Sequence, residues 1–385
     1  MTLPPLGVAP NGVAPLGVAA NGVAPLGAAP IGIALIGGGF MADVHSRAAR
    51  AAGARVVGVT SSTPERSRAA AERIGAERAF DDVDALLADP NIDVVHVVTP
   101  NATHHALTVR ALAAGKHVVC EKPLATTVAD AVDLEKRAAK AGVVATVPFV
   151  YRFHPMVREA RARVAAGQVG RLFSVQGAYL QDWLLGAADD NWRVSTAAGG
   201  ASRAFADIGS HLCDLLEFVT GERLARLQAV TRTVFAERAS TGPVSTEDLA
   251  GVLAQTGSGA VVSLLVSQVA PGRKNGLVLE VHGATESLRF VQERPEELWI
   301  GRRTGSELHL RNTDELHPDA ARLSVLPPGH PLGYHDAFTA FAADTYAAVR
   351  GSPPDGLPVF ADGVRAACIT DAVLASAAAG TWIDL

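Results

Sequence analysis

The feature that most constrains the fold is a regular alternation of apolar strands and helix-length segments between residues 31 and 149. Runs such as IGIALIG, VVHVVTP and HVVCEKP are each followed by a stretch with the length and pattern of an amphipathic helix. Strands that alternate with helices in this way predict a parallel, doubly wound sheet. The expected fold class of this part is α/β, and its expected domain spans residues 31–150.

The pattern changes after Tyr151, where strands follow one another without intervening helices. Seven strand-like segments from LFSVQGAYLQ to ELWIGRR predict a mostly antiparallel, open sheet in an α+β domain that spans residues 151–385. One helix, Asp207 to Gly221, interrupts these strands. Two late helices are expected near 335–349 and 362–379, and the last of them is expected to pack back on the first domain.

Composition excludes several classes of protein. A net charge of −5 and a pI near 6.2 favour neither a nucleic-acid partner nor a membrane surface. The basic cluster of Arg158, Arg161 and Arg163 is typical of a solvated helix face. Three distant cysteines form neither a disulfide framework nor a zinc motif, so no metal site and a reducing, cytoplasmic location are expected.

The first thirty residues repeat a short motif. PLGVAPNGVA begins at Pro5, PLGVAANGVA at Pro15 and PLGAAPIGIA at Pro25. A segment this rich in proline and glycine has little to bury, which predicts a disordered tail over residues 1–30. A signal peptide is not expected, because the first basic residue is Arg47.

A glycine-rich turn follows the first strand. GGGFMA, residues 37–42, fits the GxGxxA pattern that joins a strand to a helix in dinucleotide-binding Rossmann domains. Gly37 permits the tight turn, and Gly39 allows a pyrophosphate to approach the backbone at the helix start, beside Phe40 and Met41. A plain glycine-rich turn is the alternative, and the context favours a dinucleotide.

The tip of the second strand bears on the choice between NAD and NADP. NAD-specific sites usually carry an acidic residue there, whereas this chain has Ser61 and Ser62, with Arg66 nearby. Hydroxyls and an arginine suit a 2′-phosphate, which favours NADP slightly over NAD. The alternative is that these hydroxyl residues only cap the next helix.

Four motifs in order, GGGFMA, TPNATH, CEKPLA and DIGSHLCD, show that the sequence from Ile31 onward resembles the Gfo/Idh/MocA (glucose-fructose oxidoreductase/inositol dehydrogenase) family. In that family the lysine of the E-K-P motif is catalytic and lies beside the nicotinamide, which points to Lys122. The resemblance also implies that Asp207 and His211 are the catalytic pair contributed by the second domain. It places Glu121 near the nicotinamide ribose, and it implies that the groove is lined by Thr99, Pro100, Asn101 and His104.

Elementary chemistry agrees with these roles. Ligands of doubly wound sheets bind at the carboxyl ends of strands, where Glu121 and Lys122 stand. Asp207 and His211 are four residues apart and share one face of a helix. Histidine is suited to exchange a hydroxyl proton near neutral pH.

Two further segments suggest the substrate. Residues 179–183 and 191–193 combine aromatic rings with hydrogen-bonding groups, which suits the C–H faces and hydroxyls of a sugar. The alternative is that their tryptophans are core or interface residues. The expected substrate contacts are Lys122, Arg152, Asp182, Trp183, Trp192, Arg193, Asp207 and His211.

These observations predict a cytoplasmic NAD(P)-dependent oxidoreductase that transfers hydride between nicotinamide and a secondary hydroxyl of a sugar, glycoside or cyclitol. A homodimer or homotetramer through the C-terminal sheet is expected. Two alternatives stay open from the resemblance: a catalytically inactive dinucleotide-sensing regulator, and a glycosidase of the same fold that uses NAD transiently.

Overall fold

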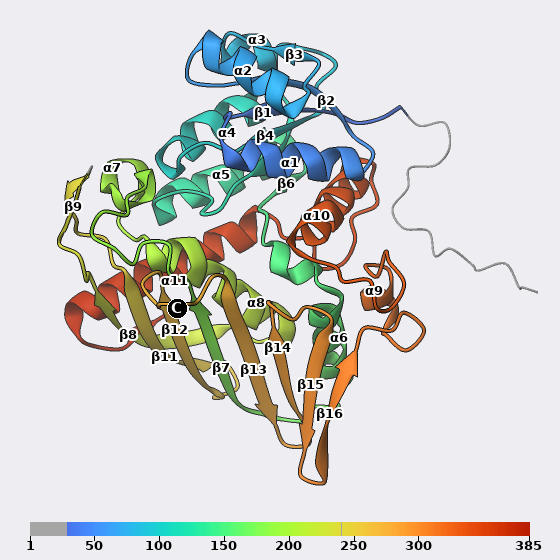
Figure 1. Cartoon of the computed structure of the whole chain (residues 1–385), viewed down its shortest axis with the longest axis vertical. Coiled ribbons are helices and arrows are strands. Elements are labelled where there is room, and N and C mark those ends of the chain that lie inside the picture. Colours follow the sequence, from blue (N-terminus) through green and yellow to red (C-terminus); the bar gives the residue numbers. More distant parts are fainter. Residues whose placement is uncertain (1–28, 240) are drawn as a thin grey trace, which may run out of the picture.

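The computed structural model describes residues 29–239 and 241–385, so nearly all of the proposed tail lies outside the described residues. The chain folds into two layers that each contain one large sheet (Figure 1). The first sheet, coloured blue to teal, is surrounded by helices, and the second fans out beneath it.

The first sheet has six parallel strands in the order β3-β2-β1-β4-β5-β6. Its strands are β1 (Gly32–Ile36), β2 (Arg55–Thr60), β3 (Arg78–Ala79), β4 (Val94–Val97), β5 (His117–Cys120) and β6 (Ala145–Thr146). Both faces are buried: Ile33 and Leu35 of β1 pack into one core cluster, and Ala34 and Ile36 pack into another. This confirms the doubly wound parallel sheet that the sequence predicted.

Helices cover both faces of this sheet. They are α1 (Phe40–Ala51), α2 (Pro64–Ile74), α3 (Val83–Leu87), the short 3₁₀ turn η1 (Asn101–Thr103), α4 (His104–Ala113) and α5 (Val128–Ala141). Local sequence sets their ends, as α5 shows. The Thr127 hydroxyl accepts the backbone N–H of Asp130, and Gly142 ends the helix with a left-handed φ of 65°.

The second sheet has nine strands in the order β16-β15-β14-β13-β7-β12-β11-β8-β17. They are β7 (Leu172–Leu180), β8 (Leu224–Arg232), β11 (Leu249–Thr256), β12 (Val261–Ser267), β13 (Gly276–Gly283), β14 (Ser287–Val291), β15 (Glu297–Arg302), β16 (Gly305–Leu310) and β17 (Ile383–Asp384). Only β7 and β12 pair in parallel, so the predicted, mostly antiparallel sheet is confirmed. A small hairpin, β9 (Glu237–Arg238) with β10 (Gly242–Pro243), stands apart from it.

The remaining helices connect the two layers. They are η2 (Val150–Phe153), α6 (Pro155–Ala165), η3 (Trp192–Val194), α7 (Thr196–Gly199), a π-helical turn η4 (Phe205–Gly209), α8 (Ser210–Thr220), α9 (Pro318–Ala321), α10 (Tyr334–Val349) and α11 (Phe360–Ala379). Near the end of the chain, α10 packs on α1, while α11 lies between α5 and β8 (Figure 1).

The predicted solvated face of α6 is wrong for Arg158. Its side chain is fully buried and donates to the carbonyls of Arg152 and Asp355 and to the carboxylate of Asp319. The guanidinium also lies over the ring of Phe218. A buried arginine needs several hydrogen-bond partners to offset the loss of water. Arg158 of α6 therefore points into the protein and not into solvent.

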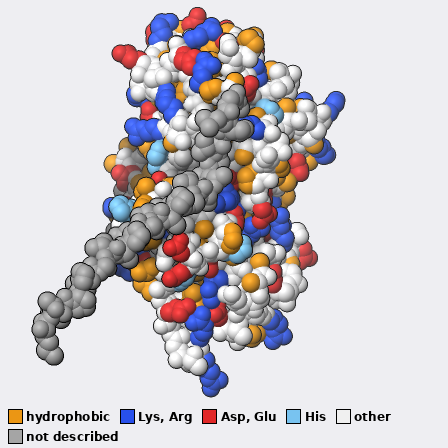
Figure 2. Space-filling view, turned by 90° about the vertical axis from the view of Figure 1, so that its right-hand side faces the viewer, with side chains coloured by type: hydrophobic (Ala, Val, Ile, Leu, Met, Phe, Trp, Pro, Cys, Tyr) orange, Lys and Arg blue, Asp and Glu red, His pale blue; other side chains and the backbone are white. Residues whose placement is uncertain are grey.

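Surface and membrane features are plain. Figure 2 shows basic and acidic side chains interspersed on one face of the molecule, which agrees with a net charge of only −5. Within residues 29–239 and 241–385 no helix is long and apolar enough to cross a membrane. In the same residues no cluster of side chains could hold a metal ion, and the three cysteines are free thiols.

Candidate active site

A groove with a volume of about 660 Å³ runs along the carboxyl ends of β1, β2, β4 and β5. It includes the point where the strand order reverses between β1 and β4, which is where doubly wound sheets bind nucleotides. Every residue that the sequence predicted for the cofactor lies in its wall. These residues are Gly37, Gly39, Phe40, Met41, Ser61, Ser62, Arg66, Thr99, Pro100, Asn101, His104, Glu121 and Lys122.

The glycine-rich turn fits a pyrophosphate. Gly37 has a φ of 117°, and a Cβ there would lie 2.8 Å from the carbonyl oxygen of Val98. A Cβ on Gly39 would meet no atom within 4 Å, so the space above that residue is open. Gly39 is the N-cap of α1 and provides no side chain to bind the first helical N–H groups. These N–H groups are therefore free to donate hydrogen bonds to an anion.

Two predicted groove residues are held by the backbone of the protein itself. The Asn101 amide donates to the carbonyl oxygen of Gly199 at 2.9 Å. The His104 ring nitrogens lie 2.8 Å from the Pro123 oxygen and 2.9 Å from the Thr99 oxygen. These side chains shape the groove by fixing its loops.

At the tip of β2, the cap of the next helix is Thr63, whose hydroxyl accepts the backbone N–H of Arg66. Arg66 donates from Nη1 to the Ser62 hydroxyl at 3.0 Å. Both Ser62 and Arg66 are exposed at the rim of the groove. Both side chains therefore lie at the β2 end of the groove.

An ion pair joins the loop after β5 to the turn η4. Lys122 follows β5, and its ammonium donates to Oδ1 of Asp207 at 2.6 Å and to the Asp207 carbonyl oxygen at 2.9 Å. The second carboxylate oxygen of Asp207 accepts from Gln268 at 2.8 Å. Burial opposes ionisation of Asp207, but Lys122 and then Arg193 lower its pKa to about 2.

His211 is neutral at pH 7. Burial, followed by the nearby Lys122 ammonium, lowers its pKa to about 3. Its ring packs edge-on against Phe149 and Tyr151. Within the described residues the imidazole has no hydrogen-bond partner, and Asp207 faces Lys122 instead of this ring. The π-helical turn η4 carries Asp207 and leads directly into α8, which carries His211.

A second cavity of about 430 Å³ adjoins the groove and shares Phe40, Met41, Glu121, Lys122 and Arg193 with it. Its far wall is a hydrogen-bonded set of uncharged side chains. The hydroxyls of Tyr151 and Tyr179 lie 2.5 Å apart, and Asn275 contacts both. Gln181 links Asn275 to the indole N–H of Trp183.

Sequence reasoning missed several residues of this cavity, chiefly Tyr151, Asn275, Tyr334 and Phe338, and missed Gln268 behind Asp207. Asn275 follows an exposed turn, and Tyr334 opens α10 more than 120 residues after η4. No local motif marks such positions, because only the tertiary fold brings them to the cleft.

The predicted substrate contacts are only partly brought together. Trp183 lines the second cavity, Trp192 lines the cofactor groove and Arg193 lines both. Asp182 lines neither cavity. Its carboxylate accepts from Lys274 at 2.8 Å and from the backbone N–H of Gly272 at 3.0 Å.

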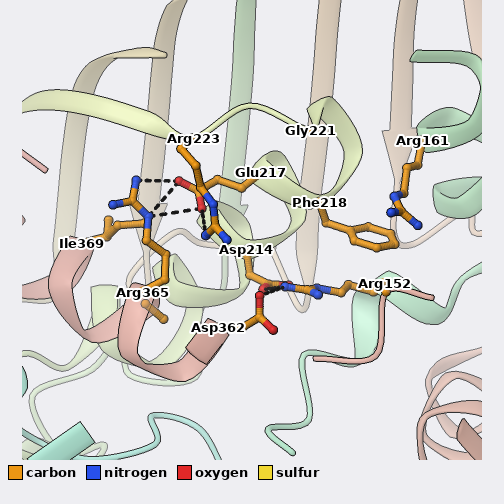
Figure 3. A pocket seen from close by; sticks show the side chains of 12 residues that line it. Arg152, Arg161, Asp214, Glu217, Phe218, Gly221, Arg223, Asp362, Arg365 and Ile369 are labelled. Atoms are coloured by element: carbon orange, nitrogen blue, oxygen red, sulfur yellow. Dashed lines mark hydrogen bonds and ion pairs between the residues drawn. The ribbon is translucent and has the colours of Figure 1, made fainter. Parts of the chain in front are cut away.

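Arg152 also lies away from the cleft. In Figure 3 its side chain extends from η2 toward Asp214 of α8 and Asp362 of α11, in a separate charged pocket. It donates through Nε to Asp214 at 2.8 Å and through Nη2 to Asp214 and, at 2.9 Å, to Asp362. The prediction that it faces the cleft does not match this placement, because the carboxylates of Asp214 and Asp362 hold the guanidinium.

Comparison with protein families gives two consecutive matches. Residues 31–149 match the oxidoreductase family with an NAD-binding Rossmann fold, and residues 157–289 match the GFO/IDH/MocA C-terminal domain.

Similar proteins span nearly the whole chain. Levoglucosan dehydrogenase of Pseudarthrobacter phenanthrenivorans is 32% identical, over 90% of this chain and 96% of its own. A levoglucosan dehydrogenase structure with NADH and levoglucosan has a TM-score of 0.87 at 32% identity, covering 93% of this chain and 99% of that one. An inositol dehydrogenase homolog from Azotobacter vinelandii with NADH and myo-inositol has a TM-score of 0.83 at 29% identity, covering 93% and 98%. The chain therefore belongs to the Gfo/Idh/MocA family of oxidoreductases, among the nicotinamide-dependent sugar and cyclitol dehydrogenases.

Proposed function

We propose that this protein oxidises a secondary hydroxyl of an uncharged cyclic sugar, with levoglucosan-like anhydrosugars as the first candidates. The observation that carries the proposal is the position of the Lys122–Asp207 pair. Lys122 lines both the cofactor groove and the second cavity, and Asp207 and His211 line the second cavity beside it. A substrate in that cavity would therefore adjoin the groove and face a cation, a carboxylate and a neutral imidazole.

The roles follow from charge and protonation. A bound nicotinamide would supply the hydride acceptor. His211 is neutral, so its free ring nitrogen can accept the hydroxyl proton of the substrate. The Lys122 ammonium stabilises the alkoxide oxygen as that proton leaves, and Asp207 holds the ammonium in place.

The lining of the second cavity supports an uncharged substrate. Its charged members are Glu121, Asp207, Lys122 and Arg193, whose charges cancel. Arg193 lies 3.5 Å from the Asp207 carboxylate, so its charge already faces a carboxylate. The tyrosine, asparagine and glutamine wall offers hydroxyl and amide groups to a polyol. A levoglucosan dehydrogenase and an inositol dehydrogenase homolog with bound levoglucosan or myo-inositol support the same class.

We propose NAD(H) as the cofactor. The absence of a carboxylate at the tip of β2 predicted a slight preference for NADP. Structures of levoglucosan dehydrogenase with NADH and of an inositol dehydrogenase homolog with NAD⁺ support NAD(H) and give that preference no support. Ser61 and Ser62 are able to contact ribose hydroxyls as well as a phosphate.

We also propose that copies of the chain associate through the open face of the second sheet. The opposite face packs on α8, whereas this one exposes Val230, Leu253, Val261 and Leu265. These side chains come from the neighbouring strands β8, β11 and β12 and form one apolar surface. Light scattering on the purified protein should give a dimer or tetramer, and Leu265→Asp with Val261→Asp should shift it toward the monomer.

A substrate panel tests the function. Levoglucosan, myo-inositol, glucose and glucose 6-phosphate are each offered with NAD⁺ and with NADP⁺, and reduced nicotinamide is followed by absorbance. We expect net reduction with an uncharged cyclic sugar and little with the phosphorylated one. Cofactor binding without turnover of any sugar would favour the regulator. Release of a sugar from a glycoside without net reduction would favour the glycosidase.

A further inference from the structure

A chain of four titratable side chains runs from the active site into the core. Glu121 accepts from Nε2 of His45 at 2.9 Å, and Nδ1 of His45 lies 2.9 Å from Nδ1 of His96. Nε2 of His96 lies 3.3 Å from the hydroxyl of Tyr346. All four side chains are buried, and the three behind Glu121 are at most 2% exposed.

The four residues come from four separate elements. Glu121 ends β5, His45 lies on α1, His96 lies on β4 and Tyr346 lies on α10. The rings pack as well as bond. His45 is edge-on to both His96 and Phe338, with centroids 5.1 Å apart in each case. Polar side chains in an apolar core cost stability unless they are hydrogen-bonded, and these four are linked to one another.

The direction of the hydrogen bonds is constrained at the Glu121 end. An ionised carboxylate can only accept, so His45 must carry its hydrogen on Nε2. If His45 is neutral, His96 donates to it and Tyr346 donates to His96; if His45 is protonated, both of these bonds reverse. The N–H of His45 points at Glu121 in either state.

Both oxygens of Glu121 are then used. Oε1 accepts from His45, and Oε2 accepts from the backbone N–H of Lys122 at 3.0 Å. Burial on its own raises the pKa of Glu121, but the contact with His45 and then the charge of Lys122 bring it below its usual value. Without the donor from His45, the largest contribution that lowers this pKa is lost.

We infer that His45, held by His96 and Tyr346, is a positioning residue that keeps Glu121 ionised and turned toward the Lys122 backbone. Glu121 lines both cavities and stands next to the residue that pairs with Asp207. These hydrogen bonds thus keep a negative charge on Glu121 beside the nicotinamide end of the groove. They also hold the turn that orients Lys122. This inference rests on the proposed function for its kinetic consequence, but the ionisation of Glu121 does not depend on it.

Other groups around Glu121 bear on its titration. The charged and titratable neighbours, besides His45, are Lys122, His104 at the start of α4, His211 on α8 and Tyr334 on α10. Only Lys122 among these carries a positive charge at neutral pH. Without the His45 donor, the Lys122 ammonium is the one cation of this set that still lowers the pKa of Glu121, whereas burial raises it.

The test uses His45→Leu, which removes the donor, and His45→Gln, whose amide nitrogen replaces Nε2. In His45→Leu the pKa of Glu121 should rise above its value in the wild-type protein, because burial then meets fewer opposing contacts. Difference infrared spectroscopy on the free protein should then show a protonated carboxyl near pH 6 that disappears at pH 9, with Glu121→Gln as the blank. Turnover and NADH affinity of this variant should fall about tenfold at pH 6 and recover as the pH rises. His45→Gln should restore wild-type behaviour.

Two variants separate positioning from packing. Phe341→Leu removes volume from the same core cluster without touching the hydrogen-bonded chain. It should lower the melting temperature as His45→Leu does, without the protonated carboxyl or the pH dependence. Tyr346→Phe should shift the pH profile in the same direction by a smaller amount, which keeps the test open if His45→Leu does not fold.

The infrared result distinguishes this inference from the proposed function. If wild-type protein turns over no sugar, the proposed function fails, while the infrared comparison still reports on Glu121. An unprotonated Glu121 in His45→Leu at pH 6, or the same pH dependence in Phe341→Leu, would overturn the inference.

Discussion

The ammonium of Lys122 lies 2.6 Å from Oδ1 of Asp207, although 85 residues separate them in the chain. Lys122 ends a strand of the parallel sheet, and Asp207 belongs to the π-helical turn that precedes α8. One contact therefore ties the cofactor side of the cleft to the substrate side. Both side chains are about 15% exposed, so the pair is largely shielded from water but open to a ligand.

The first prediction concerns this pair. Asp207→Asn removes the charge that Lys122 faces and should lower the free energy of unfolding by about 1.5–3 kcal/mol. Chemical denaturation of Asp207→Asn, Lys122→Met and the double variant measures their coupling. We expect a coupling free energy of at least about 1 kcal/mol, because the residues are in contact. Strict additivity would show that the contact contributes nothing to stability.

The second prediction concerns His211 and the pH dependence of stability. Its pKa is about 3 in the folded protein and about 6.5 when unfolded, so below pH 6.5 the unfolded state binds a proton that the folded state does not. The free energy of unfolding should therefore fall as pH falls below 6.5, by up to about 1.4 kcal/mol per pH unit from this residue.

His211→Gln should remove that part of the slope between pH 6.5 and 4.5 in urea titrations. His335→Gln, which changes an exposed histidine of α10, is the matched control and should leave the slope nearly unchanged. Equal slopes in wild type and His211→Gln would mean that the buried imidazole titrates normally.

The third prediction separates structure from substrate binding at Arg152. Arg152→Met leaves the buried carboxylate of Asp214 and the partly exposed carboxylate of Asp362 without this cation and should cost about 3–5 kcal/mol of stability. Arg161→Met, in the same pocket but paired with an exposed Asp355, should cost at most about 1 kcal/mol. The Michaelis constant for the sugar should be the same in Arg152→Met and Arg161→Met as in the wild-type protein. A large rise in the Michaelis constant of Arg152→Met with unchanged stability would instead indicate that Arg152 binds the substrate.

The fourth prediction concerns the cofactor. Calorimetric titration should show tighter binding of NADH than of NADPH, and Arg66→Ala should change NADH affinity little because Arg66 lies at the exposed rim. Arg50→Ala, an exposed arginine of α1 outside the groove, is the control. Preferred binding of NADPH that is lost in Arg66→Ala would support the choice that the strand tip first suggested.

The sequence predicted those parts of the molecule that depend on local pattern. Apolar runs and glycine-rich turns determine β1, β4 and β5, and with them the groove and the position of Lys122. The apolar run from Ala260 to Val269 likewise predicted a strand, and β12 forms there with alternately exposed and buried side chains. Apolar runs and glycine-rich turns are reliable sequence signals because residues close together in the chain determine the local structure.

The parts that could not be predicted depend on contacts between distant elements. Arg152 and Arg158 stand in sequence beside the expected cleft and on an expected exposed helix face, yet distant carboxylates on α8, α9 and α11 bury both. Asn275 and Tyr334 enter the cavity only because the second sheet and α10 return to it. The His45–His96 contact likewise needs α1 and β4 to be neighbours.

The central claim is that the Lys122 ammonium takes part in hydride transfer at the junction of the two cavities. Single-turnover absorbance of reduced nicotinamide, with NAD⁺ and sugar saturating, tests it most directly in Lys122→Met. Lys274→Met is the control, since Lys274 also pairs with an aspartate but is exposed and lies outside both cavities. We predict a rate lower by about 10²- to 10³-fold in Lys122→Met, although this variant should still bind NADH, and an unchanged rate in Lys274→Met. A near-normal rate in Lys122→Met would contradict the account.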